Sequence, residues 1–364
     1  MKKIGIYVHI PFCVQKCPYC DFFSINANEV EMDRYTSKIT TKIYKWGETL
    51  NTKADTLYFG GGTPSYIGAE RLCIIADSVK LSFGLENAEI TAEVNPSKEE
   101  FDFERLIEGG FNRISLGLQS ANDEELKKLG RVHNVSNVEN CIESAKKAGF
   151  KNISLDLMIA TPSQTKDSLE RSIEFCAKHD VQHISAYILK IEDGTPFALN
   201  KGLLNLPNDD EQAEMYLFAC EKLKEYGYNQ YEISNFSKKG FESRHNLKYW
   251  NVEEYLGMGP SAHSFINGKR FYYPRNMEDF YNGLRVDDGE GGSEEEYIML
   301  RLRLAEGVNY VQYKERFGHE MSEKYISNAR KFINTGYLII DDNGIRLTAK
   351  GFIVSNSIIT EILA

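Results

Sequence analysis

CVQKCPYC, residues 13–20, places three cysteines on one short loop directly after the apolar segment 4–10. Structural zinc sites usually take four protein ligands, and the loop offers no fourth cysteine. A [4Fe–4S] cluster normally takes four thiolates too, so three thiolates leave one iron open to another ligand. The spacing therefore favours Cys13, Cys17 and Cys20 as ligands of an iron–sulfur cluster. Zinc and unliganded thiols are the alternatives.

The other four cysteines lie singly on apolar stretches of expected helices: Cys73, Cys141, Cys176 and Cys220. We expect them to be small buried hydrophobic residues. The total of seven is odd, which argues against a disulfide framework.

Composition sets wider limits. The chain has 364 residues, 42% of them hydrophobic and 26% charged, which is typical of one large globular domain with a smaller one. The N-terminus, MKKIGIYVHIPFC, is interpreted as a strand because its apolar run is interrupted and no signal-peptide cleavage site follows. No apolar stretch approaches the roughly 20 residues of a membrane helix. We therefore expect a cytoplasmic protein. Its net charge of −10 weakens the nucleic-acid-binding class.

Strand-like and helix-like segments alternate through the first half. The expected strands are 4–10, 56–59, 89–94, 113–118, 153–158 and 183–189, and the expected helices include 31–45, 69–81 and 165–178. Capping boxes at 97–100 and 136–139 are expected to open two more helices. Repeated strand–helix units imply parallel strands with right-handed crossovers. The predicted fold class is α/β, a partial (β/α)6 barrel over residues 1–205, in preference to a closed eight-unit barrel.

The second half is less regular. A connecting region, 206–286, contains an expected helix at 209–226, and residues 287–293, DDGEGGS, have the composition of a linker. Three helices and an Asn-Gly hairpin are then expected within 294–364, which resembles a winged helix, an α+β arrangement. The charge of this segment is nearly balanced, so we expect a packing or partner-docking domain and not a DNA reader.

Chemically notable residues fall at the ends of the expected strands. The cysteines follow the first strand and Gly60-Gly-Gly62 follows the second; Glu93 ends the third, Gln119 follows the fourth and Asp156 lies within the fifth. In parallel α/β folds the functional loops gather at the carboxyl ends of the strands. The sequence therefore predicts one shared site.

The cysteine loop resembles the CxxxCxxC motif of the radical-SAM superfamily, with Tyr19 as the aromatic residue before the last cysteine. The segments YVHIPFC, FGGGTPS, EVNP, RISLGLQS and LGRVHN are similar to one branch, which contains the oxygen-independent coproporphyrinogen III oxidases and the HemW-type haem chaperones. The resemblance covers essentially the whole chain. It implies a [4Fe–4S] cluster whose open iron binds the amino and carboxylate groups of S-adenosylmethionine (SAM).

The resemblance also implies a SAM site, residue by residue. Gly61, Gly62 and Thr63 match the glycine motif whose backbone meets the methionine amino group, and Glu93 matches an acidic residue near that group. The remaining matches line SAM or lie near it: Tyr7, Tyr19, Gln119, Arg131 and Asp156. Out of this context each would be interpreted as an ordinary strand or surface residue.

Three features favour the chaperones over the oxidases, which decarboxylate two propionates of coproporphyrinogen III. Phe22 stands where the oxidase pattern CxxxCxxCxC has a further cysteine. The oxidases carry a long extension before their cysteines, whereas only 12 residues precede Cys13 in this sequence. Residues 245–250, HNLKYW, resemble the HNxxYW signature of the chaperone branch.

That signature implies haem binding. A neutral imidazole is a good axial ligand for haem iron, so His245 is the expected ligand. Tyr249 and Trp250 are expected to flank the macrocycle and Asn246 to orient the imidazole. The residues alone favour another interpretation, in which His245 and Asn246 cap a turn and Trp250 belongs to the core. His263 is a weaker second candidate.

The expected function is therefore that of a haem chaperone, which holds the cluster and SAM and passes haem to acceptor proteins, some of them membrane-associated. An electron donor for the cluster is an expected partner, the resemblance allows a homodimer, and no nucleic acid is expected. Whether a radical is formed, and hence whether the chain is an enzyme, stays open. The competing classes are the oxidase, a radical-SAM enzyme acting on RNA, and a zinc-stabilised binding module.

Overall fold

The computed structural model describes residues 3–97 and 99–364, and a twelve-stranded sheet forms its centre. Six consecutive strands lie side by side and run parallel, as predicted. They are β1 (Ile4–Ile10), β2 (Ala54–Gly61), β3 (Glu89–Val94), β4 (Arg113–Gln119), β5 (Ile153–Ile159) and β6 (His183–Ile188). Their residues are almost all buried, because helices and loops cover both faces of a parallel sheet.

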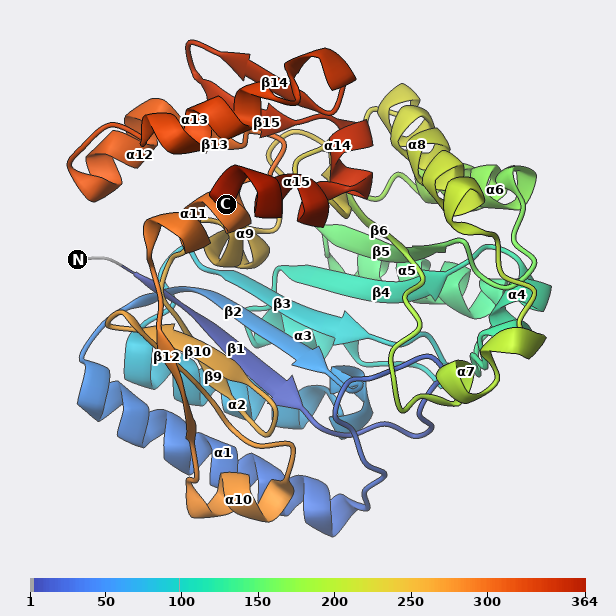
Figure 1. Ribbon diagram of the computed structural model, residues 1–364. Helices are drawn as coiled ribbons and strands as arrows, with labels where there is room; N and C mark the ends of the chain where they lie inside the picture. The colour runs from blue at the N-terminus through green and yellow to red at the C-terminus, as the bar shows by residue number, and fades with distance from the viewer. Residues whose placement is uncertain (1–2, 98) are drawn as a thin grey trace.

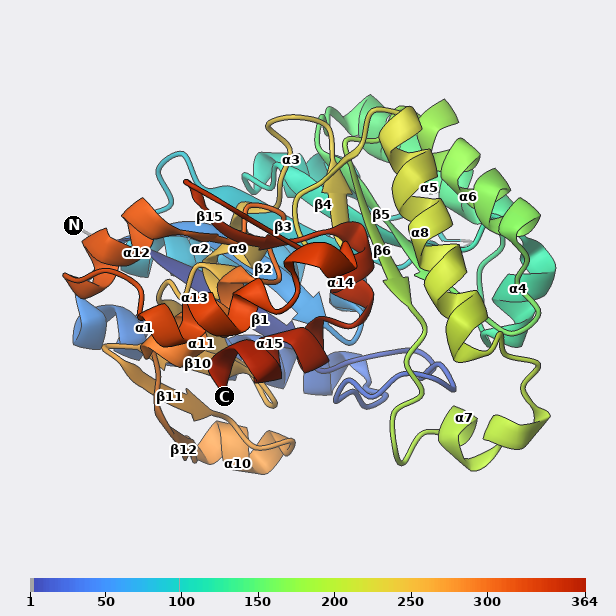
Figure 2. The same ribbon diagram turned by 45° about the horizontal axis from the view of Figure 1, so that its top comes forward.

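Helices connect these strands and cover the sheet. They are α1 (Glu29–Leu50), α2 (Ala69–Phe83), α3 (Phe103–Glu108), α4 (Asp123–Lys128), α5 (Val135–Ala148) and α6 (Lys166–Lys178). Figures 1 and 2 place α1 and α2 on one side of the sheet and the C-terminal helices on the other. Within the described part of the chain, no helix combines the length and apolarity needed to cross a membrane.

Two predicted helix starts are wrong. The box expected at 97–100, of which residue 98 lies outside the described residues, does not open a helix; α3 begins at Phe103, where Asp102 accepts a hydrogen bond from the Arg105 amide. The box expected at 136–139 is displaced in the opposite direction, toward the N-terminus. Asn134 and Asn137 cap α5 reciprocally, because an asparagine two residues earlier serves equally well as the N-cap.

The second half extends the sheet at both edges. Strand β9 (Tyr255–Met258) pairs parallel with β1, and β10 (His263–Ile266), β11 (Lys269–Tyr272) and β12 (Val286–Glu290) follow it outward. Strands β8 (Asn235–Ser237) and β7 (Asn229–Gln230) flank β6. The intervening helices are α7 (Pro196–Leu199), α8 (Asp209–Glu225), α9 (Arg244–Trp250) and α10 (Met277–Asn282). The linker expected at 287–293 is therefore wrong in its first half, which belongs to β12.

The C-terminal part is a small α+β unit built on an antiparallel sheet. Its strands are β13 (Val308–Asn309), β14 (Leu338–Asp341) and β15 (Gly344–Leu347), in the order β13-β15-β14. Its helices are α11 (Glu294–Arg301), α12 (Tyr310–Phe317), α13 (Glu323–Arg330), α14 (Ala349–Ile353) and α15 (Ser355–Leu363). The predicted hairpin and three helices are present, and β13, α14 and α15 are additional. Figure 1 shows this unit stacked over α9.

Candidate functional site

A cavity of about 580 Å³ opens at the carboxyl ends of the parallel strands, a size within the range of ligand pockets. Most of the predicted site residues line it: Cys13, Cys17, Tyr19, Cys20, Gly61, Gly62, Thr63, Glu93, Gln119, Arg131 and Asp156. These residues come from the loop after β1, from β2 to β5 and from the segment after α4. The topology thus assembles side chains that are far apart in sequence.

Backbone hydrogen bonds hold the cysteine loop against the end of β2. The amide of Cys13 donates to the carbonyl of Ile25, so the loop closes on itself. The amide of Gly62 donates to Ile10 at 2.8 Å, and that of Thr63 donates to Phe12 at 2.8 Å. A Cβ on Gly62 would lie 2.6 Å from the Phe12 oxygen, so only glycine allows this approach.

A polar network joins two of the cysteines. The Cys13 sulfur and the Thr63 hydroxyl lie 3.2 Å apart, and the Asn95 side-chain amide donates to the same hydroxyl at 2.9 Å. Arg131 donates to the Asn95 side-chain oxygen at 2.8 Å and reaches the Cys17 sulfur at 3.6 Å. Arg131 and Asn95 thus link the two sulfur atoms through one chain of side-chain contacts.

The three thiols face a common space. Burial raises the pKa of the Cys20 thiol, and the charges of Cys17 and Cys13 add to this shift. No three His, Cys, Asp or Glu side chains in residues 3–97 and 99–364 are grouped closely enough to hold a single metal ion. The three thiols line the same cavity as the glycine motif and Glu93.

Two half-buried carboxyl groups, Glu93 and Asp156, line the cavity. Burial, reinforced by the charge of Asp156, raises the pKa of Glu93 to about 7, although Tyr58 donates to Glu93 at 2.8 Å. Burial likewise raises the pKa of Asp156 to about 6, although the Ser115 hydroxyl donates to it at 3.1 Å. A cationic ligand would restore the charged form of both groups.

The two remaining cavity residues are held by aromatic neighbours. The Gln119 side chain accepts a hydrogen bond from Tyr187 at 3.2 Å, and its backbone has a φ of 65°, a left-handed conformation that is uncommon for a residue other than glycine. Tyr19 packs on Phe197 of α7 and accepts a hydrogen bond from Arg131 at 3.4 Å. The left-handed backbone of Gln119 at the end of β4 directs its side-chain amide toward the cavity.

The mouth of the cavity differs in character. Phe22 lines it and is 65% exposed. Lys190 pairs with Glu192 at 2.8 Å, and Arg275 forms two hydrogen bonds to Asp21, directly after the last cysteine of the loop. The rim is therefore charged and open, whereas the floor is buried.

Tyr7 and the four predicted haem residues are not brought into this cavity. Tyr7 lies one layer below it, with its hydroxyl 3.2 Å from the His9 ring. Asn246, Tyr249 and Trp250 are half-buried on α9.

His245 does not fit the predicted role of axial ligand. Its ring is 1% exposed, and both of its nitrogens already have partners: Nδ1 lies 2.8 Å from the Thr56 hydroxyl and Nε2 2.7 Å from the Tyr249 hydroxyl. Neither ring nitrogen is therefore free to bind iron in this structure. The interpretation from the residues alone is wrong in its first part, because Ser243 and not His245 or Asn246 caps α9. Trp250, which that interpretation places in the core, is half-buried.

Sequence reasoning missed several cavity residues, among them Asn95, Tyr58 and Tyr187. Asn95 stands two residues after Glu93 in the EVNP segment. Tyr58 stands two residues after Thr56 and therefore lies on the same face of β2. The period of two along a strand could have identified Tyr58. Tyr187 carried no such local signal.

Comparisons with known proteins agree with this architecture. The sequence model of the radical SAM superfamily matches residues 7–176, and that of the HemN C-terminal domain matches residues 295–354. The chain is 34% identical to haem chaperone HemW of Lactococcus lactis, over 100% of this chain and 98% of that protein. It is 34% identical to haem chaperone HemW of Bacillus subtilis, over 97% of each.

A third relative, from Danio rerio, is the mitochondrial radical S-adenosyl methionine domain-containing protein 1, at 31% identity over 99% of this chain and 87% of that one. Among solved structures, coproporphyrinogen III oxidase (HemN) from Escherichia coli superposes with a TM-score of 0.84 at 21% identity, over 99% of this chain and 90% of that chain. This likeness concerns the fold.

Proposed function

Because the chain belongs to the HemW haem chaperone family, within the radical SAM superfamily, we propose that it binds haem and passes it to haem-requiring acceptor proteins. We propose further that the cavity holds a [4Fe–4S] cluster and SAM. The observation that carries the second part is the convergence of three thiols, a half-buried carboxyl pair and one guanidinium on a single cavity.

Cys13, Cys17 and Cys20 would bind three irons of the cluster. No other cysteine of the described residues lines the cavity, so the fourth iron is left to the amino and carboxylate groups of SAM. When bound, the cluster supplies electrons for one-electron chemistry on SAM. Arg131 would hold the cysteine loop near the end of β4, because it bonds both the Cys17 sulfur at 3.6 Å and the Gly117 carbonyl within β4 at 3.3 Å.

The rest of the cavity suits the methionine end of SAM. Glu93 would accept hydrogen bonds from its ammonium group, and Tyr58 and the Gly61 amide hold that carboxylate in place. The backbone of Gly61 and Gly62 leaves room for close approach, and Thr63 is anchored next to Cys13. Gln119, Asp156 and Tyr19 would line the remaining wall. These side chains bind and orient; none is assigned a proton transfer.

Haem enters this proposal as cargo, without an assigned ligand. His245 is closed to it, whereas the side chain of His263 is 58% exposed and stacks on Tyr272 at 4.9 Å. His263 is therefore the better placed of the two histidines predicted from sequence. Acceptor proteins, including membrane-associated ones, an electron donor and a second copy of the chain complete the proposed partners, and no nucleic acid is among them.

A cytoplasmic location is part of the proposal. Its support is that all seven cysteines are free thiols, the state that reducing compartments maintain. Cys73 and Cys176 are buried and Cys141 and Cys220 half-buried, each on a helix, in keeping with packing roles.

Titration of the anaerobically reconstituted protein with haem, with and without the cluster, tests the function. We expect a Soret band that saturates, and transfer of haem to an apo-acceptor. The same protein incubated with coproporphyrinogen III, SAM and a reductant should yield no protoporphyrinogen IX. Formation of that product would establish the oxidase instead, and a colourless, zinc-loaded protein would refute the cluster.

A further inference from the structure

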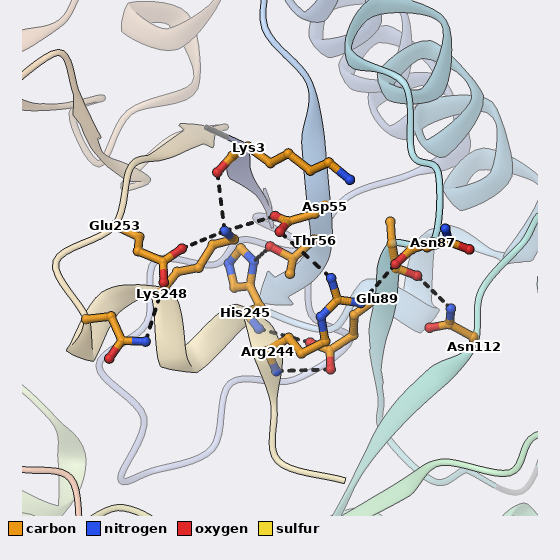
Figure 3. Close-up of polar contacts among 12 residues, drawn as sticks. Lys3, Asp55, Thr56, Asn87, Glu89, Asn112, Arg244, His245, Lys248 and Glu253 are labelled. Carbon is orange, nitrogen blue, oxygen red and sulfur yellow. Dashed lines mark hydrogen bonds and ion pairs between the residues drawn. The ribbon is translucent and has the colours of Figure 1, made fainter. Parts of the chain in front are cut away.

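Helix α9 lies against the amino-terminal ends of β1, β2 and β3, whereas the cavity lies at their carboxyl ends. The backbone amides of Arg244 and His245 both donate to the Glu89 carboxylate, at 3.1 and 3.0 Å. Figure 3 shows this carboxylate below the first turn of the helix and Lys248 between Asp55 and Glu253, each 2.9 Å away. The helix is thus anchored to β2 and β3 by buried charge.

The helix also packs directly on β1. A Cβ on Gly5 would lie 3.0 Å from the Lys248 side chain and 3.3 Å from the His245 ring. The bonds of the ring nitrogens to Thr56 and Tyr249 then fix the orientation of the imidazole. Burial lowers the pKa of His245 to about 3, and the nearby charges of Lys248 and Arg113 add to this shift. A neutral, fully bonded ring in such a place is a packing platform.

One tyrosine connects this platform to the proposed SAM site. The ring of Tyr58 stacks on His245, with centroids 5.3 Å apart and an interplanar angle of 25°. The hydroxyl of the same tyrosine donates to Glu93 at 2.8 Å. Tyr58 therefore stands between His245 below and the carboxylate that faces the cavity above.

A second tyrosine leads to the cysteine loop. Tyr7 stacks on His245 with centroids 6.4 Å apart, and its hydroxyl lies 3.2 Å from Nδ1 of His9. Nε2 of His9 lies 2.9 Å from the carbonyl of Phe23, three residues after Cys20. Because a carbonyl only accepts, Nε2 of the neutral His9 ring carries the proton and Nδ1 accepts from Tyr7.

We infer that His245 is a positioning residue for the SAM site: its ring supports Tyr58 and Tyr7, and through them it fixes the Glu93 carboxylate and the cysteine loop. This inference rests on the proposed SAM site. It assigns the histidine of the HNxxYW segment to SAM binding, not to haem iron. The disagreement with the expected haem ligand follows from the two occupied ring nitrogens.

The test compares His245→Gln with His183→Gln in the full-length, cluster-loaded protein. His183 is a matched control because it is equally buried and both of its nitrogens are bonded, to Ser154 at 2.7 Å and Tyr231 at 2.8 Å. Neither of these partners contacts Glu93 or the cysteine loop in any bond found among the described residues. The two variants should therefore lose similar free energies of unfolding but differ in their affinity for SAM.

We expect His245→Gln to weaken SAM binding, measured by equilibrium dialysis, by about tenfold, and His183→Gln by less than about twofold. The SAM-induced change in the electron paramagnetic resonance spectrum of the reduced cluster should shrink in the first variant alone. Tyr58→Phe should reproduce the loss of SAM affinity. The double variant should lose less affinity than the two single losses combined, because both substitutions act through one contact. The Soret band of bound haem should stay unchanged in all of them.

Equal SAM affinities of His245→Gln and the wild type, or equal losses in both histidine variants, would overturn the inference. So would a lost or shifted Soret band in His245→Gln alone, which would restore the haem ligand. Should His245→Gln fail to fold, Tyr249→Phe removes one partner of the ring and keeps the ring; SAM affinity that is unchanged there also counts against positioning. A wild-type protein that holds its cluster but binds no SAM refutes the proposed site itself, independently of the variants.

Discussion

Glu93 predicts a pH dependence of SAM binding. An ammonium group binds the ionised carboxylate, and burial with the nearby charge of Asp156 places the pKa of Glu93 at about 7. Its ionised fraction is then about 0.9 at pH 8 and about 0.1 at pH 6. The dissociation constant of SAM should therefore rise about tenfold between pH 8 and pH 6. Tyr58, Arg113 and the Gly61 amide favour the ionised form, but burial and Asp156 outweigh them.

The assay is equilibrium binding of SAM to the cluster-loaded protein at closely spaced pH values. Glu93→Gln should weaken binding at pH 8 by about 10- to 100-fold, since a hydrogen bond to a charged group contributes ~1.5–3 kcal/mol, and should remove most of the pH dependence. The residual slope belongs to Asp156, whose pKa is about 6. Glu232→Gln is the control, because burial raises the pKa of Glu232 to about 7 as well but that residue does not line the cavity.

The same carboxyl group has an opposite effect on the stability of the ligand-free protein. Its pKa is raised from 4.5 in the unfolded chain to about 7, so the folded state binds the proton more tightly. The stability that this group contributes is complete below pH 4.5 and is lost as the pH rises through 7, by on the order of 3 kcal/mol. Urea unfolding of Glu93→Gln should lack this loss. A dissociation constant that is flat from pH 6 to 8, or a pH dependence removed by Glu232→Gln, would refute the reasoning.

Three shorter predictions concern the loop and its supports. Cys13→Ala should retain only a small fraction of the wild-type iron after anaerobic reconstitution, whereas Cys141→Ala should retain it all; equal iron contents would contradict the assignment. Gly62→Ala should lower the free energy of unfolding by about 1–3 kcal/mol, because its Cβ meets backbone oxygens at the end of β1, and Gly202→Ala, with open space around it, should change it by less than about 0.5 kcal/mol. Arg275→Ala removes an exposed ion pair and should cost under about 1 kcal/mol in urea unfolding; a larger loss would mean that this pair anchors the loop.

The features that were predictable from sequence are those with local signals. The run IGIYVHI predicts a buried strand from seven consecutive residues, and each of the six central strands has a comparable run. Parallel pairing then places the carboxyl ends together, so Cys13, Glu93 and Asp156 could be assigned to one site from the sequence alone. Helix starts were less predictable. Asn134 and Ser136 are both good N-caps, and their N-cap preferences are too similar for the sequence to decide between them.

Features that depend on distant partners were not predictable. Strand β9 pairs with β1 from the other half of the chain, and four residues at 255–258 carry no signal for that choice. The state of His245 is a similar case. Its two nitrogens find Thr56, far along the chain, and Tyr249, one helical turn away. The sequence shows that a motif contains an imidazole with two ring nitrogens. Whether either nitrogen is available to a metal depends on whether other segments of the chain already form hydrogen bonds to it.

Helix α9 is held at both ends, and this has a consequence for the C-terminal unit. Its first turn is bound to β3 by Glu89, and the segment after its last turn is bound by the C-terminal unit: Arg316 donates to the Val252 carbonyl at 3.0 Å, and the buried Arg301 donates to the Asn251 side chain. A displacement of α11 or α12 therefore pulls on the helix that carries His245. The His245 ring on this helix is itself bonded to Thr56 and Tyr249 and stacks on Tyr58. The C-terminal unit is thus bonded to the segment that follows α9 through one buried side chain, Arg301, and one exposed side chain, Arg316.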